Sequence, residues 1–461
     1  MTATADDIAA LVQKHYDALP AKRKPVIRDN GLREWVPLAG IVAEGKDGKL
    51  SCLALATGMK CLPASKLPQA QGNVLHDWHA EVLAIRAFNR FVLDECKAVL
   101  QGRSSEFLRR RTPDEIAADT KGQEGDGGIW HDQPFAWKEG LVLHMYCSEA
   151  PCGDASMELI MAEQEDATPW DVPSTATITT PNIPLTEVEP TLPGRAYFSQ
   201  LGVVRRKPAR SDAQPTLSKS CSDKLALKQC TSLLSSPAAL LIDPRNVYLS
   251  TLVMPASRYS ESACRRAFSA AEGGGRMRCL VGLDEKGGYA FQPFIVQITS
   301  SEFRFSQRSV MSALVDTTDN IIQSDEQQPK VAAGTAPSNL SVAWTRSGRE
   351  ETTLGGTLQG RKQFDPRGAS FASRRKTWAL VAEVIQLLEQ AEREAEEERE
   401  KDKETASHPA TGKIKETLNA DTYSEMKTCT LLGPRRRAKE EARKEALKGW
   451  IRNTGDESFT L

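Results

Sequence analysis

The sequence predicts an α/β fold, built as one large domain with surface insertions. Apolar segments of strand length alternate along the chain with longer segments whose apolar side chains have helical spacing. Hydrophobic residues make up 40% of the 461 positions and charged residues 26%, as is ordinary for a globular protein. No Pro-, Gly- or Ser-rich linker separates self-contained apolar blocks, so we expect a single domain over residues 1–461.

The strands are expected in short apolar segments that turn residues bound on either side. These segments are residues 35–42, 50–58, 141–146, 247–253, 291–298 and 341–344. The first two flank the turn residues Gly45–Lys49, so we expect them to pair as a hairpin.

The helices are expected where apolar side chains recur every three or four residues. These stretches are residues 6–19, 82–88, the segments after Cys152 and after Cys221, 377–392 and 435–448. Residues 393–407 continue the fifth stretch but lack an apolar face, which indicates a solvated extension or disorder.

Three segments rich in charged, polar or glycine residues are expected as mobile insertions. They are residues 101–138, 316–336 and 393–415. Residues 163–193 carry many Thr, Pro and Glu residues with little periodicity, and we expect them to form a loop.

The chain has no predicted membrane span, because its longest apolar runs fall well short of the ~20 residues that a spanning helix needs. Its first seven residues are acidic and lack the apolar core of a signal peptide, so we expect an intracellular protein of the nucleus or cytoplasm. The ten cysteines are then mostly reduced, and two of them are better explained as metal ligands than as a disulfide.

Net charge is −1, but basic residues are concentrated in a few clusters. These are residues 205–207, 361–362, 374–376 and 435–437. Any single cluster is more often a solvated face, yet several of them around the motifs described next favour a phosphate-binding surface.

Three motifs supply side chains of the types that bind a metal and move protons. His79 and Glu81 have the His-x-Glu spacing in which the imidazole binds a metal and the carboxylate moves protons. Cys152 precedes a predicted helix, where the helix dipole favours a thiolate, and Cys221 lies between two lysines ahead of another helix. One histidine, two cysteines and an open position make a catalytic zinc site. The alternative for His79 and Glu81 alone is an ordinary helix start with a first-turn acid.

These blocks, residues 79–81, 151–155 and 220–224, together resemble the adenosine deaminase domain shared by RNA-editing and tRNA-specific adenosine deaminases. Residues 155–159 and 359–368 are more similar to the fungal tRNA-specific members. The resemblance implies a deaminase-type domain with a mixed central sheet flanked by helices. It also implies that His79, Cys152 and Cys221 hold Zn²⁺.

The resemblance further implies hydrolytic deamination of adenosine to inosine, with Glu81 accepting a proton from water and delivering one to the purine N1. The implied substrate is the adenosine 3′ of the anticodon in alanine tRNA. Unstacking the nucleotide costs a few kcal/mol in a duplex and less in a loop, so a hairpin loop is the easier substrate.

The same family buries inositol hexakisphosphate in its core, and basic and aromatic positions here match that pattern. The matching positions are Arg86, Lys224, Tyr423, Lys427 and Trp450. Asp77 and Lys207 resemble the polar relay between this ligand and the active site. Ile85, Leu227 and Lys228 depart from the editing enzymes, which implies that the polyphosphate sits differently or binds less tightly.

Four further residues are expected near the RNA. Lys60 matches a family lysine close to the pocket, and Thr57 is a candidate to hold the ribose, although an ordinary strand-end role is as plausible for Lys60. Arg361 and Lys362 are candidates for contacts with RNA phosphates, as are the residues of cluster 205–207.

Two alternative functions stay open. The first is editing of duplex RNA, which is disfavoured because no room exists for double-stranded-RNA-binding domains ahead of residue 35. The second is a zinc-stabilised RNA-binding module without catalysis, in which Glu81 would have no use. A deaminase of free nucleosides is disfavoured by the chain length and the basic clusters.

Overall fold

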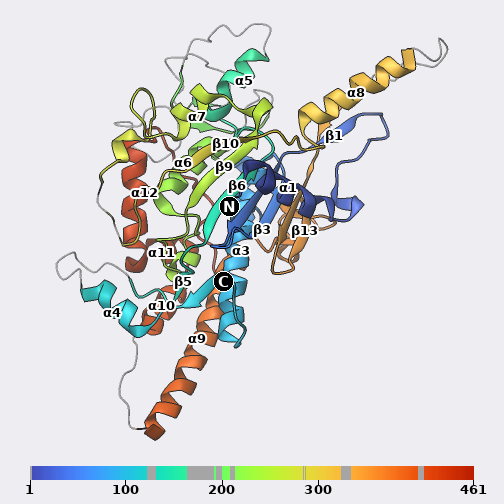
Figure 1. Ribbon diagram of the computed structural model, residues 1–461. Coiled ribbons are helices and arrows are strands. Elements are labelled where there is room, and N and C mark those ends of the chain that lie inside the picture. The colour runs from blue at the N-terminus through green and yellow to red at the C-terminus, as the bar shows by residue number, and fades with distance from the viewer. Residues whose placement is uncertain are drawn as a thin grey trace.

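An eight-stranded mixed sheet forms the centre of the computed structural model, which describes residues 3–121, 131–163, 192–193, 200–207, 213–283, 285, 287–322, 334–402 and 410–461. The strands, in order across the sheet, are β10 (Ile295–Thr299), β9 (Leu249–Pro255), β6 (Val142–Cys147), β2 (Leu38–Glu44), β3 (Leu50–Thr57), β12 (Leu340–Thr345), β13 (Glu350–Leu354) and β14 (Thr357–Leu358). Helices cover both faces of this sheet (Figure 1). The predicted α/β fold with a mixed sheet is confirmed.

The sheet is antiparallel from β6 to β14 and parallel from β6 to β10. The predicted hairpin is the β2–β3 pair, in which Leu38 faces Thr57 and Glu44 faces Leu50. Each predicted strand overlaps a strand of this sheet. Strand β13 was not predicted because its sequence, Glu350–Leu354, is mostly polar; it pairs with β12 on one side and with the short edge strand β14 on the other.

The helices are α1 (Ala5–Asp17), α2 (Leu67–Ala70), α3 (Ala80–Leu100), α4 (Pro113–Lys121), α5 (Met157–Ala162), α6 (Cys221–Thr231), α7 (Glu261–Phe268), α8 (Gln307–Ile322), α9 (Arg374–Asp402), α10 (Ala410–Leu418), α11 (Tyr423–Thr428) and α12 (Gly433–Glu445). Among the described residues, no helix is long and apolar enough to cross a membrane.

The two faces of the sheet bury separate cores. Along β2, Ala39 and Ile41 lie in the larger core with α3, whereas Leu38 and Val42 lie in the smaller core with α1. This alternation is the two-residue period of a strand that is covered on both sides. Helix α3 packs on β3, β2 and β12, and this packing holds the first turn of α3 in place relative to the sheet.

The region predicted as insertion 101–138 contains ordered structure that joins the core. Strands β4 (Leu108–Arg110) and β5 (Phe135–Trp137) pair with each other, and α4 lies between them. The Phe107 and Trp137 rings stack at 6.0 Å and are buried in the larger core. This part differs from the expected surface insertion because its aromatic residues fill a gap beside α3; residues 122–130 lie outside the described residues.

The other expected insertions are described only in part. Helix α8 covers the start of 316–336 and β11 (Thr335–Pro337) its end, where β11 pairs with β1 (Arg33–Trp35). Helix α9 extends to Asp402, and α10 buries Ile414 in the larger core. Residues 323–333 and 403–409, and 164–191 of the expected loop, lie outside the described residues.

Candidate active site and cation cluster

The three predicted metal ligands come together where three helical segments begin. His79 is the N-cap of α3, and Cys221 is the first residue of α6. Cys152 precedes a short 3₁₀ turn that leads into α5. Between them Gly153 adopts φ +103°, and a Cβ there would lie 2.3 Å from the Ser220 hydroxyl oxygen. Glycine is therefore needed for the Cys152 loop to approach the start of α6.

Cys152 contacts both of the other two candidate ligands, Cys221 and His79. The backbone N–H of Cys221 donates to the Cys152 Sγ at 3.4 Å. The Cys221 thiol, then Lys207 and His79, hold the pKa of Cys152 well below its usual value. Cys152 is thus stabilised as a thiolate, which is the form that binds metals.

Glu81 lies in the first turn of α3 and is buried beside these ligands. Burial, followed by the charge of Cys152, raises the pKa of Glu81 above its usual value of 4.5. A carboxylate with a raised pKa can both accept and return a proton near neutral pH. Among the described residues, Glu81 forms no ion pair with a lysine or arginine, so its carboxyl is available for that role.

Asp77 is the centre of the polar contacts behind His79. Its carboxylate accepts hydrogen bonds from Lys207 Nζ at 2.8 Å, Ser218 Oγ at 2.6 Å and Lys224 Nζ. It also accepts from the His79 backbone N–H at 3.0 Å and lies 2.9 Å from His79 Nδ1. Burial opposes ionisation, but Lys207 and Lys224 hold the pKa of Asp77 well below its usual range.

Lys207 joins this carboxylate to the cysteines, because its Nζ also lies 3.2 Å from the Cys221 Sγ. The contacts therefore run from Lys224 through Asp77 to Lys207 and Cys221. The structure thus places Asp77 and Lys207, the two residues of the predicted relay, in direct contact; their role as a relay to a bound polyphosphate stays a prediction.

The donor set fits a zinc ion with three protein ligands. A metal-binding histidine commonly donates its other ring N–H to a carboxylate, and Asp77 occupies that place beside His79. Donor atoms of Cys61, Asp77 and His79 also lie within 4.8 Å of one another. The Asp77 oxygens are already held by two lysines and a serine, so we favour His79, Cys152 and Cys221 as the ligands.

A cluster of cations lies behind the active site, and we call it the cation cluster. Its members are Arg86, Lys219, Lys224, Lys228, Arg374, Lys427, Arg435, Lys439 and Arg443. Burial, then the charges of Arg374 and Arg435, lowers the pKa of Lys427 to about 8. Burial and neighbouring cations likewise hold the pKa of Lys228 and Lys439 well below the usual value.

Aromatic rings and unpaired donors complete the cation cluster. Trp450 lies under Lys219 and Arg443, with cation-to-ring distances of 5.8 and 5.1 Å. Tyr423 lies beside Lys427 at 5.6 Å. The buried Nε atoms of Arg435 and Arg443 have no hydrogen-bond partner in the described part of the chain. Repelling cations with unused buried donors fit a polyanion, which would supply both charge and acceptors.

Six members of the cation cluster were not predicted to bind the polyphosphate, namely Lys219, Lys228, Arg374, Arg435, Lys439 and Arg443. Lys228 was noted only as a departure from the editing enzymes, and Lys219 only as a neighbour of Cys221. Lys439 and Arg443 continue from Arg435 at four-residue spacing along α12, so their shared helix face was a usable signal. Arg435 itself belonged to a predicted surface cluster but is buried.

The predicted RNA contacts separate into exposed and buried residues. Arg361 and Lys362 are exposed, and Lys60 is partly exposed with its Nζ at the Asn339 side chain. Thr57 is buried, and its hydroxyl oxygen accepts a hydrogen bond from the Val342 backbone N–H; its contact with a ribose stays a prediction.

The basic cluster 205–207 is not a phosphate-binding surface. Arg205, Arg206 and Lys207 are all buried, because this segment pairs with residues beside Cys221 rather than facing solvent. The predicted surface contacts there are wrong.

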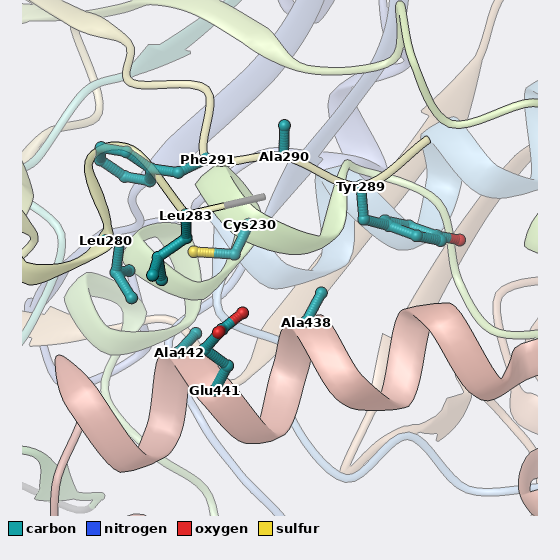
Figure 2. Close-up of a pocket in the computed structure, with 9 residues that line it drawn as sticks. All are labelled: Cys230, Leu280, Leu283, Tyr289, Ala290, Phe291, Ala438, Glu441 and Ala442. Atoms are coloured by element: carbon teal, nitrogen blue, oxygen red, sulfur yellow. The ribbon is translucent and has the colours of Figure 1, made fainter. Parts of the chain in front are cut away.

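A separate apolar pocket of about 20 Å³ lies beside α12, with room for about one water molecule. Figure 2 shows Ala438, Glu441 and Ala442 of α12 facing Cys230 and Leu280 across it. Its lining contains none of His79, Glu81, Cys152 and Cys221, so it is not the candidate active site.

Residues 54–454 match the family model of the adenosine-deaminase (editase) domain. The chain belongs to this family. It is 38% identical over 318 residues to the tRNA-specific adenosine deaminase 1 of Schizosaccharomyces pombe, covering 68% of this chain and 73% of that protein. The Saccharomyces cerevisiae protein of the same name is 35% identical, and the match covers 54% of this chain and 58% of that protein.

A more distant relative is the double-stranded RNA-specific editase B2 of Mus musculus, with 30% identity over 125 residues, 26% of this chain and 14% of that protein. The family membership confirms that the chain is a deaminase enzyme. It also implies a metal centre, for which His79, Cys152 and Cys221 are the candidate ligands.

Proposed function

We propose that this chain is a zinc-dependent deaminase that hydrolyses adenosine to inosine in tRNA. The observation that carries the proposal is the meeting of His79, Cys152 and Cys221 beside the buried carboxyl of Glu81. The names of the two fungal relatives, both tRNA-specific adenosine deaminases, support the substrate class. Zinc in such a site supplies an activated water at neutral pH.

The protein's own residues account for the proton transfers. Glu81 is buried next to the ligands with a raised pKa, so it can accept a proton from water and deliver it to the purine N1. The carboxylate then takes the proton of the new C6 hydroxyl group and passes it to the departing amine, which leaves as ammonia while C6 becomes a carbonyl. Lys207 and Asp77 hold the orientations of Cys221 and His79 through the contacts at 3.2 and 2.9 Å.

The proposed target is a loop adenosine, specifically the one 3′ of the anticodon in alanine tRNA. This position rests on the similarity to the fungal tRNA enzymes and on the lower cost of unstacking a loop nucleotide. Exposed Arg361 and Lys362 are proposed to contact tRNA phosphates.

We further propose inositol hexakisphosphate as a structural cofactor of the cation cluster. The support is the concentration of buried cations, the lowered pKa of Lys427 and the unpaired Nε atoms of Arg435 and Arg443. Lys224 contacts both this cluster and Asp77, so the ligand would reinforce the contacts behind His79.

The test is a deamination assay on a panel of tRNA transcripts, scored by inosine sequencing. We expect inosine at the loop adenosine of alanine tRNA and a far lower rate on an adenosine inside a perfect duplex of equal length. Equal rates on both substrates would contradict the tRNA assignment and favour duplex editing. Rates on free adenosine that match those on tRNA would remove RNA from the proposal.

A further inference from the structure

The segment 455–461 lies beyond the part of the chain that matches the family model, yet its side chains enter the core behind the active site. Asp456 and Phe459 are buried, whereas Thr460 and Leu461 are exposed. Burying a carboxylate is costly unless its partners compensate. The contacts of Asp456 and Phe459 therefore indicate which parts of the core this segment stabilises.

Asp456 holds the loop that leads into the active site. Its Oδ1 accepts from the Gly72 backbone N–H at 2.8 Å, and its Oδ2 lies 2.6 Å from His76 Nε2. Burial, then the charge of Arg374, lowers the pKa of His76 to about 4. The imidazole is thus neutral at neutral pH, with Nε2–H donating to Asp456. Asp77 follows His76 directly in the chain.

Phe459 fixes the same loop from the other side. Its ring stacks on Tyr423 at 4.9 Å and meets Trp378 edge-on at 6.0 Å. A Cβ on Gly72 would lie 2.4 Å from this ring, and Gly72 has φ +70°. Only glycine therefore lets the loop and Phe459 pack this closely. The Phe459 carbonyl also accepts from the Tyr423 backbone N–H at 3.0 Å.

Asp456 also reaches the cation cluster. Arg374 NH1 donates to the Asp456 backbone carbonyl at 2.8 Å and lies 3.5 Å from its Oδ2. Arg374 is close to Lys427 and Arg86 in the cluster, since its charge lowers the pKa of both of these residues. One carboxylate thus joins the cluster to the loop of residues 72–77.

We propose that Asp456 and Phe459 form a clamp that positions Asp77 and His79 by holding residues 72–76. Asp456 and His76 are positioning residues in this proposal, because they act on the reacting groups only through Asp77 and His79. The clamp is a second connection from the cation cluster to the active site, separate from the Lys224–Asp77 contact. Its effect on catalysis rests on the proposed deaminase function, whereas its effect on the loop does not.

The first test measures the loop itself by hydrogen–deuterium exchange of the full-length protein. We expect faster exchange in peptides covering residues 71–79 when residues 456–461 are removed, and for Asp456→Ala and His76→Leu. Removal of residues 460–461 alone is the matched control and should leave exchange unchanged. Wild-type exchange in this loop for all three altered proteins would overturn the clamp.

The second test measures turnover on the tRNA substrate. For His76→Leu and Asp456→Ala we expect kcat to fall by about tenfold or more with KM nearly unchanged, since residues supporting metal ligands act at this scale. His76→Gln keeps an N–H near the Nε2 position and should restore most of the rate. Equal loss in His76→Gln and His76→Leu would contradict a role for this hydrogen bond.

The two tests separate the possible failures. If Asp456→Ala does not fold, His76→Leu and its glutamine counterpart still decide the proposal. If the wild-type protein forms no inosine in tRNA, the proposed function fails, and the exchange experiment still decides whether the clamp holds the loop. Faster exchange with unchanged kcat would contradict the positioning role.

Discussion

Glu81 is the residue on which the proposed chemistry depends most directly. Because burial raises its pKa, its carboxylate form is lost as the pH falls through a value above 4.5. We therefore predict that kcat/KM declines on the acid side at a pH above the ordinary glutamate range. A pH–rate profile on a tRNA substrate measures this, and a rate that stays flat down to the ordinary glutamate pKa would contradict it.

The cysteine ligands give a second prediction at the residue scale. Cys152→Ala and Cys221→Ala should each lose most of the bound zinc, since either change leaves two protein ligands where a catalytic zinc site needs three. Metal analysis of purified protein decides the point. Cys52→Ala, at a buried cysteine in the smaller core with α1 on the other face of the sheet, is the control and should keep the metal. Full zinc in both ligand variants would place the site elsewhere.

At this scale the motifs were predictable and the environments were not. His79, Cys152 and Cys221 were identified by residue type and order, and the structure brings them together. Burial of Arg205 and of the Thr57 hydroxyl could not be read from the sequence. Their surroundings are set by segments far away in the chain, which a local pattern does not contain.

Helix α12 determines how the cation cluster responds to mutation. Lys439 lies among Arg435, Arg443 and Lys427, which repel it. We predict that Lys439→Ala stabilises the ligand-free protein but reduces the increase in Tm on adding inositol hexakisphosphate. Thermal denaturation with and without the ligand measures both effects, and exposed Lys444→Ala is the control. An unchanged ligand-induced increase in Lys439→Ala would contradict its place in the site.

Other elements show why some boundaries were missed. The charged segment 101–138 looked like an insertion, yet β4 and β5 bury Phe107 and Trp137 against α3. Two strands this short give too little periodicity to detect. The aromatic residues within the charged stretch were therefore the only sequence feature that indicated a buried segment there. The segment after Trp450 was likewise overlooked, since its role rests on contacts with residues some 380 positions earlier.

At the scale of the whole molecule, the cation cluster links stability to pH. With the pKa of Lys427 lowered to about 8, the unfolded chain binds more protons than the folded protein between pH 8 and 10.5. Below pH 8 the ligand-free protein bears the full free-energy cost of burying the charged Lys427 side chain. Its free energy of unfolding should therefore rise as the pH increases from 8 to 10.5. We predict that the Tm increase caused by inositol hexakisphosphate is largest near pH 7 and shrinks above pH 8. An increase that does not depend on pH would contradict the role of Lys427.

Substitution of the exposed residues Arg361 and Lys362 tests whether they contribute to tRNA binding. Reversing both charges should raise KM for tRNA and make binding less sensitive to salt, because fewer counterions are released. Zinc content and kcat should stay unchanged, since neither residue touches the candidate metal site. Binding measured over a range of salt concentrations is the readout, and an unchanged salt dependence would place the tRNA elsewhere.

The most direct test of the central claim compares inosine formation in alanine tRNA by the wild-type protein and by Glu81→Gln, with zinc content measured in both samples. The proposed site predicts inosine 3′ of the anticodon with the wild-type protein, and loss of inosine with Glu81→Gln at equal zinc content. Glutamine keeps the shape of the side chain but cannot carry a proton between water and the base. Wild-type inosine yield from Glu81→Gln would contradict the account.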